Sequence, residues 1–313
     1  MGKRGTSGIN ALVAINKPVG ISSHGVVGQV RYRLSEKRVG HAGTLDPLAS
    51  GLLIMGIGQA TRLLGLITQE TKSYRAHIEF GSQTTTDDAE GEVIATANVS
   101  DKLFDEVFAK DFVASLVGHH KQVPPQFSAI SVNGQRAYKQ ARQGEAVELP
   151  ERDIEIVEAK LVGIESCDPL VWSVDFVVSK GTYIRSIARD LGPALDTCAH
   201  LCGLERLSAG PVDISQALQI DDLEGITKDN IAKVALDPCV VMNNTKVYKM
   251  NEVELQRLLQ GKTIKLYSRR PDIVDDDLVC MVLGDKMYGI WTCSNDTLRA
   301  KASFIDGIVG VRI

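Results

Sequence analysis

The chain has 313 residues, 44% of them hydrophobic and 24% charged, a composition that excludes intrinsic disorder as the overall state. Its length predicts about two domains and a core that needs no disulfide or metal support. The net charge is −4, but residues 1–75 hold ten Lys/Arg and three Asp/Glu, so they carry +7 and the rest carries −11. This asymmetry permits one face that binds a polyanion, although the acidic whole argues mildly against nucleic acid.

Targeting and metal-binding signals are both missing from the sequence. No apolar run approaches the roughly 20 residues that cross a bilayer, and the basic start leads into no apolar signal segment. We therefore expect a cytoplasmic protein without a membrane partner. The tightest cysteine cluster, Cys198-Ala-His200-Leu-Cys202, lacks a fourth zinc ligand at a recognisable spacing, so we expect no metal site.

The first elements in chain order are a strand, a turn and a helix. Residues 10–16 form an apolar strand that stops at the turn signal of residues 17–20. Either Ser22 or Ser23 then caps a helix. The apolar residues that share one face of this helix are Val26, Val27, Val30 and Leu34.

A glycine-bearing loop over residues 40–47 comes next. Residues 52–57 lack polar alternation, which predicts a strand buried on both faces, and a short helix follows over residues 62–67. Residues 72–80 alternate between apolar and polar side chains, which predicts a half-buried strand with Tyr74 on its apolar face.

The middle of the chain predicts a helix over residues 102–117 and an insertion, a hairpin and short helix, at about 121–150. Another half-buried strand covers residues 172–178. A helix then opens after Gly181, with a kink or split at Gly192-Pro193. The apolar face of this helix consists of Ile184, Ile187, Ala188, Leu191 and Leu195.

The last 70 or so residues differ in pattern and predict a small β-rich domain. One helix covers residues 251–260, and three strands follow at 278–283, 287–292 and 308–313. The predicted organisation is therefore a domain over 1–243 and a second one over 244–313.

Asp46 and Arg185 are the first candidates for chemistry. Pro47 holds Asp46 extended, and the loop precedes a buried strand, so Asp46 lies at the rim of a rigid sheet, where a nucleophile or base is well placed. An Asp-Pro turn in which the carboxylate bonds its own backbone is the ordinary alternative. Arg185, in the first turn of its helix, is either a surface arginine or the partner of a buried aspartate.

Three further residues leave two interpretations open. Tyr74 and Tyr183 are either core tyrosines or platforms that stack on a planar ligand such as a nucleobase. His41 is either a solvent-facing loop residue or a group that fills a gap in a base stack.

Five motifs in this order resemble the bacterial tRNA pseudouridine-55 synthases, the TruB family. The similarity runs from about residue 10 to the C-terminus. The motifs are Lys17-Pro-Val-Gly-Ile-Ser-Ser, Gly40-His-Ala-Gly-Thr-Leu-Asp-Pro-Leu-Ala-Ser-Gly51, Lys72-Ser-Tyr74, Gly181-Thr-Tyr-Ile-Arg-Ser186 and Gly203-Leu-Glu-Arg-Leu207.

The resemblance implies an α+β fold: a mixed, largely antiparallel central sheet of pseudouridine synthase type, and a C-terminal PUA-like β-barrel that binds RNA. It implies isomerisation of one uridine in the T-loop of tRNA to pseudouridine, with base flipping. Asp46 would be the nucleophile, by covalent addition or by removing a C2′ proton, and both routes stay open. Arg185 would pair with Asp46, and Tyr74 would stack on the uracil and assist removal of the C5 proton.

The resemblance also implies roles for the residues around the catalytic ones. Tyr183 and Leu204 would line the pocket, Lys17 would support it or approach backbone phosphate, and His41 would fill the gap left by the flipped nucleotide. The insertion at 121–150 would clamp the T-arm. No cofactor, no metal and no guide RNA are implied, and we expect a monomer.

Two rival functions remain open at this point. The chain could act only as a tRNA-folding chaperone or RNA-binding protein, although Asp46, Tyr74 and Arg185 argue for catalysis. An aspartyl-phosphate enzyme is the other alternative, but it needs a second acidic cluster for magnesium, and none is apparent.

Overall fold

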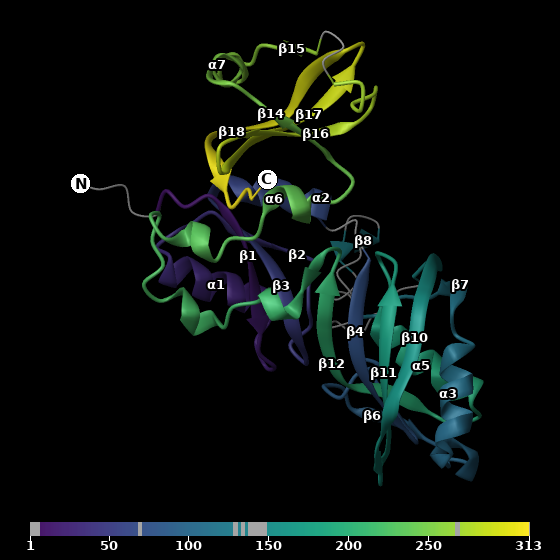
Figure 1. The fold of residues 1–313 in the computed structure, drawn as a ribbon. Helices are drawn as coiled ribbons and strands as arrows, with labels where there is room; N and C mark the ends of the chain where they lie inside the picture. Colours follow the sequence, from purple (N-terminus) through teal and green to yellow (C-terminus); the bar gives the residue numbers. More distant parts are fainter. Residues whose placement is uncertain are drawn as a thin grey trace. The chain divides into compact units, whose positions relative to one another are not determined.

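The computed structural model of the protein describes residues 7–67, 71–127, 131–132, 135–136, 149–266 and 270–312. The chain folds into two compact units, each described by itself below (Figure 1). The first unit combines Met1–Asp46, Gly51–Gln69 and Gly210–Ile313, and the second combines Pro47–Ser50 and Glu70–Ala209. The first unit therefore draws on segments that are far apart in the sequence.

Three antiparallel strands and a helix form the N-terminal part of the first unit. Strand β1 (Ala11–Lys17) and strand β2 (Val39–Ala42) both pair with β3 (Ala49–Ile57). Helix α1 (Ser23–Arg33) buries its predicted valines against these strands. Residues 40–42, predicted as loop, are strand instead, because their backbones pair with residues 54–56 of β3.

Gly58 explains how the chain turns tightly after β3. Its φ is +61°, and a side chain there would place Cβ 2.2 Å from the Ile9 carbonyl oxygen. Only glycine combines this left-handed conformation with such a close approach. The helices that follow are η1 (Gly58–Leu63) and α2 (Leu64–Ile67), where a helix was predicted.

A separate five-stranded sheet lies at the C-terminal end of the first unit, in the order β14-β16-β17-β18-β15. The β14–β16 ladder is parallel and the others are antiparallel. Trp291 and Leu298 belong to its buried core. The elements are β14 (Lys246–Lys249), α7 (Glu252–Leu259), β15 (Ile264–Lys265), β16 (Leu278–Leu283), β17 (Lys286–Ser294) and β18 (Thr297–Val309).

This sheet is compatible with the predicted PUA-like barrel. The strand predicted at 308–313 is wrong: β18 starts at Thr297, because Asn295 and Asp296, both at positive φ, turn the chain straight back from β17. The predicted boundary between 243 and 244 stays a prediction. Smaller elements join the sheet to the rest, namely β13 (Val212–Asp213), η3 (Ile214–Gln216), η4 (Ile220–Leu223), η5 (Ile231–Lys233) and α6 (Pro238–Val241).

The second unit is built on an antiparallel sheet in the order β12-β4-β11-β10-β7. Trp172 and Phe176 are buried on the face that helices α3 and α5 cover, and Figure 1 shows both helices beside these strands. The strands are β4 (Lys72–Phe80), β7 (Gly118–Gln122), β10 (Arg152–Cys167), β11 (Leu170–Val178) and β12 (Ala199–Ala209). The largely antiparallel, helix-flanked sheets confirm the predicted α+β class.

Helix α5 (Ile184–Ala194) buries the predicted apolar face and ends directly after Pro193. The other elements of this unit are β5 (Ser82–Thr84), β6 (Val93–Thr96), η2 (Asp101–Phe104), α3 (Glu106–Ala114), and the paired strands β8 (Ser131–Val132) and β9 (Gln135–Arg136). Most of the insertion predicted at 121–150 lies outside the described residues. None of the described helices has the length and apolar character to span a membrane.

Candidate active site

Asp46 lies within the short loop between β2 and β3. Gly43, at φ +74°, lets the chain leave β2, and the side chain of Leu45 is buried. The hydroxyl of Ser23 accepts a hydrogen bond from Leu45 N and donates one to Leu45 O, both at 2.8 Å. The loop is therefore fastened to the start of α1 one residue before Asp46, whose own side chain is partly exposed.

Arg185 is a buried residue in the first turn of α5. Its Nη1 lies 3.3 Å from Oδ2 of Asp88 and donates to Thr86 O at 3.1 Å, and its Nη2 donates to Phe127 O at 3.0 Å. Both charged side chains are under 10% exposed. A surface arginine is thus excluded. Asp88 is an ion-pair partner that sequence reasoning missed.

One turn further along α5, Arg189 forms a second ion pair, with Asp87, the residue before Asp88. Its Nη1 lies 3.2 Å from Oδ2 of Asp87, and its Nη2 donates to Val123 O at 2.9 Å. Burial raises the pKa of the Asp87 carboxyl, while Arg189 and Arg185 oppose that shift. Two consecutive aspartates therefore pair with arginines at i and i+4 of one helix, a spacing that was present in the sequence.

Tyr74 lies on β4 with Ala76, Ile78 and Phe80 on the buried face, as the alternation predicts. Its neighbours in the sheet are Phe176 on β11 and Arg206 on β12. Arg206 is almost fully buried, which the sequence did not indicate. The ring of Tyr74 therefore stands on an internal strand of the sheet, paired on both sides, rather than on a loop.

Tyr183 and Leu204 belong to the same unit as Tyr74. Tyr183 precedes α5, and its backbone is held by the side chain of Gln122, the last residue of β7. Leu204 lies on β12 opposite Ala76, and its carbonyl accepts a hydrogen bond from the hydroxyl of Ser50 at 3.4 Å. Both side chains are half-buried.

Lys17 and His41 belong to the first unit. Lys17 is fully buried, and its ammonium group donates to Pro18 O at 2.9 Å and Ile21 O at 2.6 Å. These bonds hold the turn that follows β1, and the roles expected of Lys17, support of the pocket or approach to backbone phosphate, stay predictions. His41 lies on β2 opposite Met55 and is half-buried.

The structure thus brings Tyr74, Tyr183, Arg185 and Leu204 together in one unit, and it places Lys17, His41 and Asp46 in the other. The pairing of Arg185 with Asp46 stays a prediction, since the two residues belong to different units. Among the described residues, no group of three His, Cys, Asp or Glu side chains is arranged to hold a metal ion.

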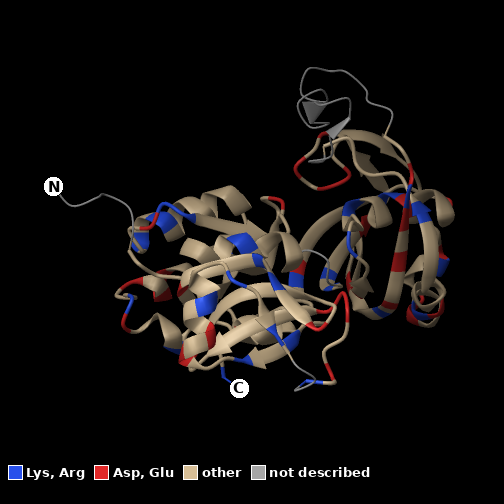
Figure 2. Ribbon diagram, turned by 90° about the horizontal axis from the view of Figure 1, so that it is seen from above, with Lys and Arg blue, Asp and Glu red and all other residues tan. Residues whose placement is uncertain are grey.

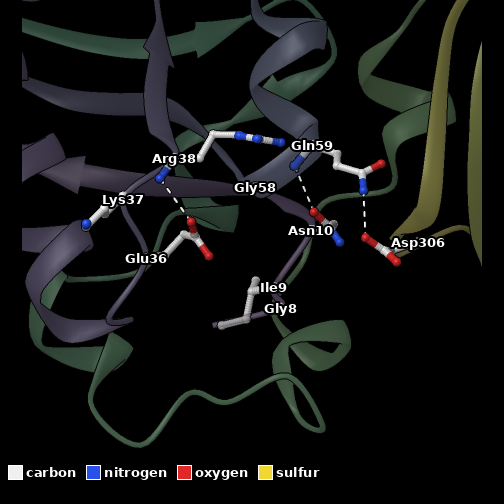
Figure 3. A pocket seen from close by; sticks show the side chains of 9 residues that line it. All are labelled: Gly8, Ile9, Asn10, Glu36, Lys37, Arg38, Gly58, Gln59 and Asp306. Carbon is white, nitrogen blue, oxygen red and sulfur yellow. Dashed lines mark hydrogen bonds between the residues drawn. The ribbon is translucent and has the colours of Figure 1, made fainter. Parts of the chain in front are cut away.

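A polar pocket of about 500 Å³ lies elsewhere in the first unit, beside the turn at Gly58 (Figure 3). The exposed side chains of Lys37 and Arg38 belong to its lining. Acidic groups there are engaged within the protein: Glu36 accepts from Arg38 N, and Asp306 accepts from Gln59. Basic and acidic residues are interspersed along the ribbon as a whole (Figure 2), and the lining of this pocket, with Lys37 and Arg38 beside Glu36 and Asp306, shows the same mixture.

Comparisons with known proteins agree with this architecture. Residues 31–184 match the family model described as TruB family pseudouridylate synthase, N-terminal domain. A protein of Bartonella henselae named tRNA pseudouridine synthase B is 34% identical over 312 residues, covering 95% of this chain and 96% of that protein. One of the same name from Thermobifida fusca is 46% identical over 219 residues, covering 68% of this chain and 74% of that protein.

Solved structures show the same fold at low sequence identity. A Cbf5-Nop10-Gar1 complex contains a chain with a TM-score of 0.64 and 20% identity, covering 97% of this chain and 83% of that one. A chain of an archaeal box H/ACA sRNP Nop10-Cbf5 complex has a TM-score of 0.63 and 19% sequence identity, covering 97% of this chain and 84% of that one. With a full-length relative above 30% identity and the five motifs in register, the chain belongs to the TruB family of pseudouridylate synthases.

Proposed function

We propose that this protein isomerises uridine 55 in the T-loop of tRNA to pseudouridine, with Asp46 as the nucleophile. The observation that carries the proposal is the near full-length similarity to a relative named tRNA pseudouridine synthase B. The loop before Asp46, which Ser23 holds by two hydrogen bonds, supports it, because a nucleophile needs a fixed position.

The reaction breaks the bond between C1′ of the ribose and N1 of the uracil and forms one between C1′ and C5. The base turns over in between, C5 loses its proton and N1 gains one, so atoms and charge balance without a redox partner. Asp46 serves either by covalent addition or by removing the C2′ proton. Arg185 pairs with it and keeps it ionised.

The remaining residues bind and orient the flipped nucleotide. Tyr74 stacks on the uracil from a rigid strand, a contact worth about 1–3 kcal/mol in single-strand binders. Tyr183 and Leu204 line the pocket, Lys17 supports the pocket from the adjoining turn, and His41 fills the place that the nucleotide leaves. The insertion at 121–150 clamps the T-arm, and the C-terminal sheet binds RNA. The protein acts as a monomer in the cytoplasm, without a guide RNA.

The proposal is tested with the purified chain and an unmodified tRNA transcript. Pseudouridine is labelled with carbodiimide and located by mass spectrometry. We expect one labelled position, in the T-loop, with the wild-type chain. Asp46→Asn keeps the shape and removes the charge, so it should cut turnover by at least about three orders of magnitude with nearly unchanged tRNA affinity. A variant that keeps a tenth of the activity would remove Asp46 from the nucleophile role.

A further inference from the structure

Ser23 makes an unusual pair of contacts for the first residue of a helix. Its Oγ lies 2.8 Å from both the backbone N and the backbone O of Leu45, 22 residues away. Ser23 is 1% exposed and Leu45 is 3% exposed. One buried hydroxyl therefore satisfies both backbone polar groups of a single loop residue.

The neighbouring serine leaves Ser23 available for this contact. Ser22 is the N-cap of α1, and its hydroxyl accepts from Gly25 N at 3.0 Å. The usual function of a serine at a helix start is thus performed by Ser22. The hydroxyl of Ser23 uses its donor and an acceptor site on Leu45 instead.

These two hydrogen bonds restrain the backbone of Asp46. The Leu45 carbonyl and the Asp46 N–H belong to one planar peptide unit, so fixing that carbonyl fixes the plane that enters Asp46. On the other side, Pro47 disfavours the α region for Asp46. The backbone is therefore restrained both before and after the carboxylate.

We propose that Ser23 is a positioning residue for catalysis, which holds Asp46 in place through Leu45. This inference rests on the proposed function, in which Asp46 is the nucleophile. Ser23 itself does not touch the substrate: its contribution is to keep the loop in the reactive geometry. A misplacement of about 1 Å at a reacting group costs on the order of a hundredfold in rate.

The test compares Ser23→Ala with Ser22→Ala in the full chain. Both variants lose one hydroxyl at the same helix start, so both lose some stability. Only Ser23→Ala releases the loop. We expect its single-turnover rate on tRNA to fall about 10- to 100-fold with tRNA affinity within about threefold of wild type, whereas Ser22→Ala keeps its rate within about twofold.

A second variant keeps the test decisive if Ser23→Ala does not fold. Ser23→Cys fills nearly the same volume, but a thiol is a weak donor and a weak acceptor. We expect it to fold, as measured by thermal unfolding, and to turn over at least about fivefold more slowly than Ser22→Ala. Rates of Ser23→Ala or Ser23→Cys that equal the rate of Ser22→Ala would overturn the proposal.

Asp46→Asn separates this inference from the proposed function. If Asp46→Asn is inactive and the Ser23 variants match Ser22→Ala, the nucleophile assignment stands and the positioning role is wrong. If Asp46→Asn stays active, the nucleophile assignment fails and the role of Ser23 fails with it. If Asp46→Asn is inactive and only the Ser23 variants are slow at unchanged affinity, both are supported.

Discussion

The side-chain amide of Gln122 holds the backbone of Tyr183 with two hydrogen bonds. Oε1 accepts from Tyr183 N at 2.9 Å, and Nε2 donates to Tyr183 O at 3.1 Å. Tyr183 is the N-cap residue of α5 and makes no side-chain capping bond, so this contact from the end of β7 fixes where the helix begins. Arg185 follows within the first turn, and its position is thereby tied to the sheet.

The buried pair between Arg185 and Asp88 should stabilise the protein far more than an exposed pair does. Removing one partner of a buried ion pair costs about 3–5 kcal/mol, and without Asp88 the guanidinium of Arg185 loses the carboxylate it contacts and keeps its bonds to two carbonyl oxygens. We expect Asp88→Ala to lower the free energy of unfolding by this amount, measured by urea denaturation. Asp88→Asn should cost less, because the amide still accepts a hydrogen bond.

The control for this prediction is Asp175→Ala. Asp175 accepts from Arg75 Nε and Nη2 at 2.8 and 2.9 Å, but the two side chains are 31% and 38% exposed. Solvent screening limits such a pair to about 0–1 kcal/mol. Equal losses for Asp88→Ala and Asp175→Ala would contradict the importance of burial.

Two substitutions at Tyr74 distinguish a stacking role of its ring from a proton-transfer role of its hydroxyl. Tyr74→Phe keeps the ring and deletes the hydroxyl, whereas Tyr74→Leu deletes both. If the hydroxyl takes part in the chemistry, Tyr74→Phe should bind tRNA normally but turn over about two to four orders of magnitude more slowly. Tyr74→Leu should also lose affinity. Single-turnover assays at saturating enzyme measure the rate of each variant. A fully active Tyr74→Leu protein would mean that Tyr74 is only a core residue.

The salt dependence of tRNA affinity tests whether the basic segment of residues 1–75 contacts phosphate. Affinity for tRNA should fall steeply with salt, with a slope of log K against log[salt] of about −0.7 for each phosphate neutralised in single-stranded regions. Lys37 and Arg38 are exposed beside the polar pocket, so changing both to Gln should make the slope shallower by about 1.4.

The matched control changes Lys102 and Lys110, on the η2–α3 segment of the second unit, to Gln. It removes the same charge outside residues 1–75 and should leave the slope unchanged. If the tRNA affinity of the wild-type chain does not change with salt concentration, the charge asymmetry of the sequence has no part in tRNA binding.

Two cysteines should differ in reactivity. Burial, with Glu79 and Glu165 nearby, raises the pKa of the Cys202 thiol to about 11, whereas Cys167 is exposed. The thiolate is the reactive form, so at pH 8 only about one Cys202 in a thousand is reactive at any moment. Iodoacetamide should therefore label Cys167 long before Cys202, as measured by peptide mass spectrometry. In urea the difference should vanish; equal rates in the folded protein would contradict the assignment.

Local patterns predicted much of this fold because they report on local physics. The alternation around Tyr74 and the apolar face of α5 were both predicted, since each follows the period of its element. The start of β18 was missed because its exposed residues, such as Arg299 and Lys301, carry no apolar signal. Strand β2 was taken as a loop because its identity depends on pairing with β3.

The candidate site, like the fold, could be predicted only in part. The motifs named Asp46, Tyr74 and Arg185, but the groups that hold the site were not predicted. Asp88 is about a hundred residues from Arg185 in the sequence, and Gln122 is 61 residues from Tyr183. Such partners are chosen by tertiary structure, and one sequence contains no record of which distant residues meet.

The division of the chain into units bears on the order in which the protein is made. Strand β1 receives hydrogen bonds from Leu236 N at Leu12 O, and Val309 N donates to Asn10 O just before the strand. The first unit therefore closes only after residue 309 has left the ribosome. The second unit is complete once residue 209 has emerged, and domains generally fold as units during synthesis. A newly made chain should thus hold Tyr74 and Arg185 in place while the segment that carries Asp46 still awaits its final partners.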